Sequence, residues 1–331
     1  MQKYTILIVG GAGYIGSHMV KMLAKDGHRV IVLDNLTTGF ADAARFGEKL
    51  IVGDLADESL LDQIFTDYQF DAVMHFAAAS LVGESMENPA KYYRNNVSNT
   101  LNLLDVMVKH QVLNFVFSST AAIFGEPEYT PIDEQHPKNP INPYGASKLM
   151  VERILDDYAA AYGLNSVCLR YFNACGADPE GDLGEMHDPE THLIPLVLQA
   201  ASGRRDNIKI FGTDYETPDG TCIRDYIHIM DICRAHALSL HKILKKEIKG
   251  SNKFNLGNGN GYSVKEIIEA SKYIIKKDKK YIKVIEVNRR NGDPEILIAD
   301  NKKAKKILEY ESEKSSLKQM IHDAWEWEKN V

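Results

Sequence analysis

The sequence has little of what a membrane-spanning, secreted or nucleic-acid-binding protein needs. No apolar run approaches the length of a transmembrane helix. The first residues lead directly into a strand-like run, so we expect no signal peptide. The net charge is −7, from 46 acidic and 39 basic residues. That balance argues against nonspecific binding to nucleic acid or to an anionic membrane.

Cysteine is also scarce. The four cysteines show no CxxC pairing and no metal-ligand spacing; they are Cys168, Cys175, Cys222 and Cys233. This pattern predicts reduced thiols in a cytoplasmic enzyme and no metal site. With 331 residues, the chain can bury a sizeable core without a disulfide or a metal.

The first half of the chain alternates strand-like and helix-like segments. This order indicates a parallel sheet with helices on both faces. The strand-like runs are continuously apolar, because such strands are buried on both sides. We expect strands over residues 4–9, 29–33, 50–52, 72–76, 114–118 and 166–170, and helices over 19–24, 60–68, 95–109 and 144–162.

After about Gly176 the pattern becomes irregular and rich in Gly, Asp and Pro. We therefore predict an α/β protein with two parts. A doubly wound parallel-sheet Rossmann domain comprises residues 1–176 and about 225–258. A smaller C-terminal α/β domain comprises residues 177–224 and about 259–331. It is expected to close over the C-terminal ends of the strands, where open α/β sheets bind ligands.

A glycine-rich loop, Gly10-Gly11-Ala12-Gly13-Tyr14-Ile15-Gly16, separates the first strand from the first helix. Its glycines permit a tight turn and a close approach of the backbone to a pyrophosphate, which the helix N-terminus then faces. Asp34 ends the second strand, where a carboxylate accepts hydrogen bonds from ribose hydroxyls and repels a 2′-phosphate. No Arg or Lys follows in residues 35–40. NAD is therefore predicted in preference to NADP.

A candidate catalytic group begins the helix at Asn142-Pro143-Tyr144. Tyr144 and Lys148 are four residues apart and so share one helix face. A tyrosine with a pKa of about 10 is a poor base at neutral pH, but a nearby cation and the helix N-terminus would stabilise its phenolate. Thr120, which closes the strand from Asn114, can hydrogen-bond the reacting oxygen. Such a tyrosine and lysine also occur by chance on many helices, so the prediction depends on the glycine loop upstream.

These motifs resemble the extended short-chain dehydrogenase/reductase family. The resemblance includes the glycine loop, Asp34-Asn35, His75–Ala77, Asn95–Val97, Ser118–Thr120 and Tyr144–Lys148. Further strings narrow it to the UDP-glucose 4-epimerase group of that family. They are Leu169–Asn173, Gly203–Asp206, Ile210–Tyr215, Asp219–His228 and Arg289–Asp293.

The resemblance implies an isomerase of galactose metabolism, working as a homodimer. It would interconvert UDP-galactose and UDP-glucose through a transient 4-keto sugar, with tightly bound NAD and with Tyr144 as acid and base. The residues that it implies for NAD are Gly10, Gly13, Tyr14, Ile15, Gly16, Asp34, Asn35, Asp54, Leu55, Phe76, Ala77, Asn95, Tyr144, Lys148 and Phe172. Those that it implies for the UDP-sugar are Thr120, Tyr144, Asn173, Leu193, Phe211, Arg224, Tyr226, Arg290 and Asp293.

Three positions depart from the pattern of the group. Ser80 stands where many members have a lysine that touches the cofactor, and His192 replaces a common asparagine. Leu297 occupies the position of a bulky tyrosine that excludes N-acetylated sugars. Because leucine is smaller, some activity on UDP-N-acetylglucosamine is predicted.

Other functions remain open at this stage. A nucleotide-sugar 4,6-dehydratase of the same fold needs an acid-base pair after the threonine, whereas Ala121 and Ala122 follow Thr120 here. Another nucleotide-sugar epimerase or a decarboxylase fits the downstream strings less well. A noncatalytic NAD-sensing protein would have no reason to keep both Tyr144 and Lys148.

Overall fold

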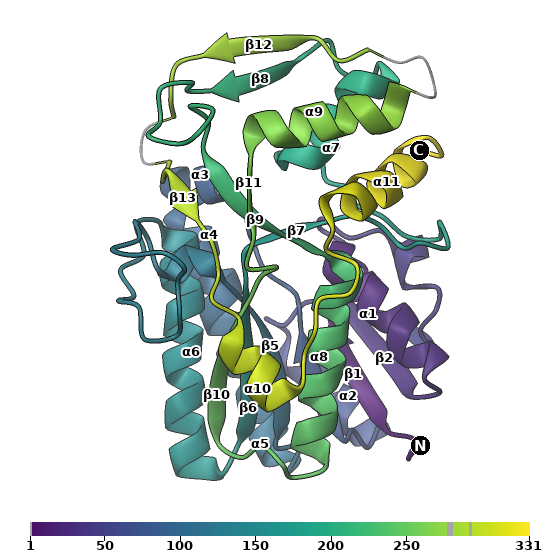
Figure 1. The fold of residues 1–331 in the computed structure, drawn as a ribbon. Helices are drawn as coiled ribbons and strands as arrows, with labels where there is room; N and C mark the ends of the chain where they lie inside the picture. Colours follow the sequence, from purple (N-terminus) through teal and green to yellow (C-terminus); the bar gives the residue numbers. More distant parts are fainter. Residues whose placement is uncertain (1, 277–280, 291–292) are drawn as a thin grey trace.

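In the computed structural model, residues 2–276, 281–290 and 293–331 are described. A large sheet runs through one part of the molecule, and smaller strands and helices gather beyond one end of it (Figure 1). The large sheet has seven strands: β1 (Thr5–Val9), β2 (Arg29–Asp34), β3 (Lys49–Val52), β4 (Ala72–His75), β5 (Asn114–Thr120), β6 (Asn165–Tyr171) and β10 (Ser251–Leu256). Their order is β10-β6-β5-β4-β1-β2-β3, and every pairing is parallel.

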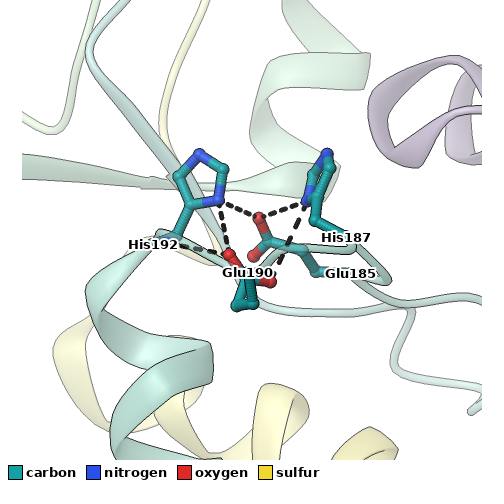
Figure 2. A group of neighbouring side chains, drawn as sticks. All are labelled: Glu185, His187, Glu190 and His192. Carbon is teal, nitrogen blue, oxygen red and sulfur yellow. Dashed lines mark hydrogen bonds and ion pairs between the residues drawn. The ribbon is translucent and has the colours of Figure 1, made fainter. Parts of the chain in front are cut away.

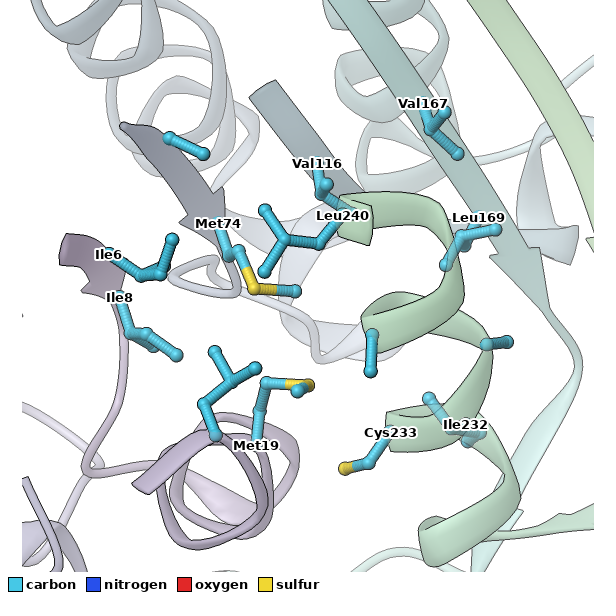
Figure 3. Close-up of a cluster of buried hydrophobic side chains, with 14 of the residues drawn as sticks. Ile6, Ile8, Met19, Met74, Val116, Val167, Leu169, Ile232, Cys233 and Leu240 are labelled. Carbon is cyan, nitrogen blue, oxygen red and sulfur yellow. The ribbon is translucent and has the colours of Figure 1, made fainter. Parts of the chain in front are cut away.

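Helices cover both faces of this sheet. Neighbouring residues of a strand point to opposite faces, so an apolar run such as β1 supplies both cores. On one face, Ile6 and Ile8 meet α1 (Tyr14–Lys25) and α8 (Ile229–Leu244), as Figure 3 shows. On the other face, Leu7 and Val9 join a core with α2 (Glu58–Asp67), α5 (Asn99–Lys109) and α6 (Pro143–Tyr162). The short elements are η1 (Ala41–Ala44), α3 (Val82–Glu87), α4 (Pro89–Tyr92), η2 (Tyr93–Ser98), η3 (Ala121–Ile123) and α10 (Lys302–Leu308).

The smaller part contains two further β structures. A four-stranded sheet has β9 (Ile223–His228) at its centre, paired with β7 (Asn173–Cys175), β11 (Gly261–Ser263) and β13 (Ile296–Leu297). A separate ribbon joins β8 (Ile208–Phe211) to β12 (Val284–Val287). A third apolar core lies among α7 (Leu193–Ser202), α9 (Val264–Ile275) and α11 (Leu317–Glu328).

The predicted fold class is confirmed: an α/β protein with a parallel Rossmann sheet and smaller C-terminal sheets. The helix expected over 95–109 begins differently, because the chain first forms the π-helix η2 and becomes α-helical at Asn99. The division into two domains stays a prediction. Two features cross the expected boundary. Ala304 and Leu308, expected in the smaller domain, pack into the core of the large sheet. Asn173 and Tyr226, both expected in the Rossmann domain, lie in the small sheet, where Asp225 pairs with Gly261.

Candidate active site

The glycine loop follows β1 in a conformation that excludes side chains. Gly10 has φ of +80°, and a Cβ atom there would lie 2.4 Å from the backbone nitrogen of Ala77. A Cβ atom on Gly16 would lie 2.0 Å from the carbonyl oxygen of Gly10. Gly13 is the N-cap of α1, and no side chain of the described residues caps that helix. Tyr14 and Ile15 form its first turn, whose N–H groups can bind the charge of a pyrophosphate.

Acceptors for the nucleoside half of a dinucleotide lie beside this loop. Asp34 is buried at the end of β2, and its carboxylate accepts 2.9 Å hydrogen bonds from the backbone N–H groups of Ala12 and Leu36. These bonds hold the carboxylate at the edge of the glycine loop. Asn35 donates to Asp54 at 2.6 Å, which places the two predicted side chains together. Leu55, in contrast, is buried in the core of the large sheet.

The end of β4 closes onto the same loop. The N–H groups of Phe76 and Ala77 donate to the carbonyl oxygen of Val9, at 2.8 and 3.1 Å. Asn95, in η2, donates to the side chain of Asn96 at 2.9 Å. Together with the close backbone approach at Gly10, this arrangement fits the predicted binding of NAD.

Tyr144 and Lys148 lie on the first turns of α6. The Asn142 side chain accepts from the backbone N–H of Gly145 at 2.8 Å and so fixes where the helix begins. The half-buried Tyr144 phenol is hydrogen-bonded to the Thr120 side chain at the end of β5. Lys148 is 2% exposed and donates through Nζ to the carbonyl oxygen of Ser118 at 2.9 Å. The three predicted catalytic residues thus meet where β5 and α6 approach each other.

Burial governs the protonation of this group. It raises the pKa of Tyr144, while the hydrogen bond with Thr120 lowers it. Burial also lowers the pKa of Lys148 to about 7, against the attraction of Cys168 and Glu152. Lys148 therefore exchanges its proton near neutral pH. The Tyr144 phenol becomes a usable base only when positive charge lies close to it.

The residues predicted for a UDP-sugar gather around the small sheet. Arg224 and Tyr226 are two residues apart on β9 and so point to the same side. The side chain of Asn173 donates to the carbonyl oxygen of Asp225 at 2.8 Å, beside Tyr226. Arg224 forms an ion pair with Asp293.

Two further predicted contacts lie at the end of β8 and the start of α7. The guanidinium of Arg290 lies 3.8 Å from the centre of the Phe211 ring. Leu193 begins α7 and packs against the apolar cluster that contains Tyr226. The string Arg289–Asp293 is described only in part, because residues 291 and 292 lie outside the described ranges.

The three departures fall in different surroundings. Ser80 is exposed. Leu297 packs with Phe172 against a small buried cluster that includes Ile123 and Phe124. His192 contacts Glu185 and Glu190.

Sequence reasoning missed residues that support the site from behind. The buried Asn96 donates to the carbonyl oxygen of Ala79 at 2.9 Å and to the Ser147 hydroxyl at 3.0 Å, which ties the loop after β4 to α6. Glu152, one turn beyond Lys148, binds Arg170. Glu152 follows Lys148 by four positions and so lies on the same face of α6. A charged residue on that buried face was the one sequence feature that could have indicated its role.

The model of the NAD dependent epimerase/dehydratase family matches residues 6–257. The chain belongs to this family.

Individual members of the epimerase/dehydratase family match nearly the whole chain. UDP-glucose 4-epimerase of Halalkalibacterium halodurans is 52% identical over 98% of this chain and 95% of its own length. UDP-glucose 4-epimerase of Brucella ovis, solved in complex with NAD, is 48% identical with a TM-score of 0.93 and covers 97% of each chain. The UDP-Glc/GlcNAc 4-epimerase of Campylobacter jejuni is 44% identical with a TM-score of 0.85, over 99% of this chain and 100% of its own. The predicted family is confirmed.

Proposed function

We propose that this chain interconverts UDP-galactose and UDP-glucose by inverting C4 of the sugar, with NAD retained through turnover. The observation that carries the proposal is the meeting of Tyr144, Thr120 and buried Lys148 beside a dinucleotide loop. The full-length similarity to UDP-glucose 4-epimerases supports the same reaction. In the rival dehydratase, an acid-base pair would follow Thr120, where this chain has Ala121 and Ala122 in η3.

The protein side of the reaction follows from the site. The glycine loop and Asp34 would hold NAD, whose chemistry is to accept and return the hydride at C4. Tyr144 takes the proton from the C4 hydroxyl and later returns it, while Thr120 hydrogen-bonds the same oxygen. Lys148, when charged, lowers the pKa of the Tyr144 phenol. C4 would be inverted because the transient 4-keto sugar presents its other face before the hydride is returned, so that the new C4–H bond forms on the opposite side while Tyr144 returns the proton to the C4 oxygen.

The UDP group would bind along the small sheet. Arg224 and Arg290 suit the pyrophosphate, because guanidinium groups donate in pairs to phosphate oxygens. Phe211 offers an aromatic face for the uracil ring. Asp293, Asn173, Tyr226 and Leu193 complete the proposed binding set; Arg224 already contacts Asp293.

The reaction is tested by mixing the purified protein with UDP-galactose, without added NAD, and following the anomeric NMR signals of the sugar. Conversion to UDP-glucose is expected. Tyr144→Phe should retain NAD and lose about 10²–10⁴-fold in turnover, the usual size of general acid–base catalysis. Tyr162→Phe, at an exposed tyrosine of the same helix, is the matched control. Unchanged turnover in Tyr144→Phe would reject the proposed role.

We also propose that the enzyme accepts UDP-N-acetylglucosamine. Leu297 is only partly buried and, like Phe172, packs against the cluster of Ile123 and Phe124, so a larger residue at position 297 would reduce the space available to the sugar. Leu297→Tyr should lower turnover of the N-acetylated sugar far more than turnover of UDP-galactose, and Leu297→Met should preserve both. Undetectable turnover of UDP-N-acetylglucosamine at high enzyme concentration would reject this breadth.

For the assembly, we propose a homodimer in which two helices of each subunit form a bundle. Light scattering coupled to size exclusion should give twice the chain mass of 37.2 kDa, and a single-chain mass would refute it. We further propose a cytoplasmic location, because all four cysteines are buried and unpaired.

No helix among the described residues is long and apolar enough to cross a membrane.

A further inference from the structure

Two histidines and two glutamates converge in the segment between β7 and α7. Glu185, His187, Glu190 and His192 lie within eight residues, and their side chains point toward one another (Figure 2). Nδ1 of His192 lies 2.7 Å from Oε1 of Glu185 and 2.9 Å from Oε1 of Glu190. Nδ1 of His187 lies 3.2 Å from Oε1 of Glu185 and 3.9 Å from Oε2 of Glu190. Both imidazoles thus present Nδ1 to the carboxylates.

This geometry has the size of a metal coordination shell. One ligand atom from each of the four residues can be chosen so that all lie within 4.8 Å of one another. In a tetrahedral zinc site with bonds of about 2.0–2.1 Å, neighbouring ligand atoms are roughly 3.3 Å apart. Imidazole nitrogen and carboxylate oxygen are both ordinary zinc ligands. We propose that Glu185, His187, Glu190 and His192 bind one Zn²⁺ ion.

Unpartnered polar atoms in the group point independently to a ligand. The Glu185 side chain is 5% exposed, and its Oε2 atom is buried without a hydrogen-bond partner among the described residues. Nδ1 of His187 is also buried and forms no hydrogen bond of acceptable geometry in that part of the chain. A buried carboxylate oxygen without a partner is costly, and a bound cation removes that cost.

The Glu190 carboxylate is oriented by its own backbone. Its Oε1 atom accepts from the N–H groups of Thr191 and His192, at 2.7 and 2.8 Å. This leaves Oε2, the atom that faces His187, for a metal ion. A ligand held in this way loses little freedom when it binds.

A second group of carboxylates, by contrast, has its negative charge balanced by a lysine. Asp178, Glu180 and Asp182 also bring their carboxylates together. The ammonium group of Lys21 lies among all three and forms ion pairs with each. In the Glu185 group, the described residues provide no lysine or arginine partner in that position, and the only paired cations are the histidines themselves.

A zinc ion here would connect residues that contact or belong to three helices, α1, α7 and α11. The ring of His187 meets the edge of Tyr14 in the first turn of α1, with ring centres 6.3 Å apart. His192 is the N-cap of α7. The indole N–H of Trp327 in α11 donates to the carbonyl oxygen of Glu185 at 3.3 Å. Four protein ligands leave no open position, so the role would be structural rather than catalytic.

The test is metal analysis of tag-free protein, because a histidine tag would itself bind zinc. Protein stripped with a chelator and titrated with Zn²⁺ should bind about one ion per chain at a four-ligand site. His187→Ala and Glu190→Gln should each weaken zinc binding at least about 100-fold, since even loss of an outer-shell partner costs 10–100-fold. Glu180→Gln, in the cluster that Lys21 occupies, should bind zinc as the wild type does.

Two results would overturn the site. One is wild-type protein that binds no zinc after chelator treatment. The other is equal zinc affinity in wild type, His187→Ala and Glu190→Gln, which would place the ion elsewhere. Because the wild-type titration needs no variant, a variant that fails to fold does not remove the test. Circular dichroism of each variant establishes that folding is intact before its affinity is compared.

Discussion

The buried ion pair behind the catalytic helix gives a prediction with a defined size. Arg170 on β6 makes two hydrogen bonds to Glu152 on α6, from Nε at 2.9 Å and from Nη2 at 2.6 Å. Ser119 donates to the same carboxylate at 2.6 Å, and both charged side chains are only 3% exposed. Arg170→Met would leave the Glu152 carboxylate buried, with the Ser119 hydroxyl as the side-chain donor that remains among the described residues. Such a change is expected to cost about 3–5 kcal/mol of unfolding free energy.

The assay is urea unfolding at saturating NAD, comparing midpoints and slopes. Arg153→Ala is the control, because Arg153 and Asp157 form an ion pair whose side chains are 76% and 63% exposed. Its cost should be only about 0.3–0.5 kcal/mol. The double variant Glu152→Met with Arg170→Met should regain most of the loss, since no buried charge remains. Equal shifts for Arg170→Met and Arg153→Ala would refute the reasoning.

Three further predictions concern the cofactor loop, the buried lysine and the small sheet. In an NAD-binding assay, Gly10→Ala should abolish NAD retention, because the new Cβ atom would clash with the backbone of Ala77. Gly83→Ala should bind NAD normally, because a Cβ atom at Gly83 would have no atom within 4 Å. Lys148 has its folded pKa lowered to about 7, so the unfolded chain holds more protons above pH 7. The unfolding free energy of cofactor-free wild type, relative to Lys148→Met, should therefore rise from pH 7 to 10, and parallel pH profiles would contradict this. Arg224→Ala should raise KM for UDP-galactose about 10–100-fold without loss of NAD, because charge-assisted hydrogen bonds worth roughly 1.5–3 kcal/mol are lost. An unchanged KM would exclude Arg224 from the substrate site.

Much of the large sheet could be predicted because its strands obey one simple rule. A run such as Val30–Leu33 is buried on both faces, so it is apolar throughout and easily recognised. The glycine loop is equally legible, since Gly10 and Gly16 stand where any side chain would collide with backbone. The helix start at Asn142-Pro143 follows from capping chemistry that is local in sequence.

What could not be predicted depends on contacts between distant segments. Glu152 and Arg170 read as ordinary charges until α6 and β6 are packed together. The π-helical turn at η2 has no pattern of its own, yet it carries Asn96, whose side chain donates to the carbonyl oxygen of Ala79 in the loop after β4. The four proposed zinc ligands did lie close in sequence, but only the fold shows that their side chains converge.

The strand order also has a consequence for how the chain is made. β6 pairs with β10, so residues 165–171 wait for residues 251–256 before that edge of the sheet is covered. A chain growing from its N-terminus therefore carries β6 paired with β5 on one side only, and its other edge, which includes Val167 and Leu169, stays open until synthesis has passed Leu256. Chains that stop before β10 are released with this edge of β6 unpaired. Premature termination in that interval should therefore yield aggregates rather than a smaller soluble nucleotide-binding unit.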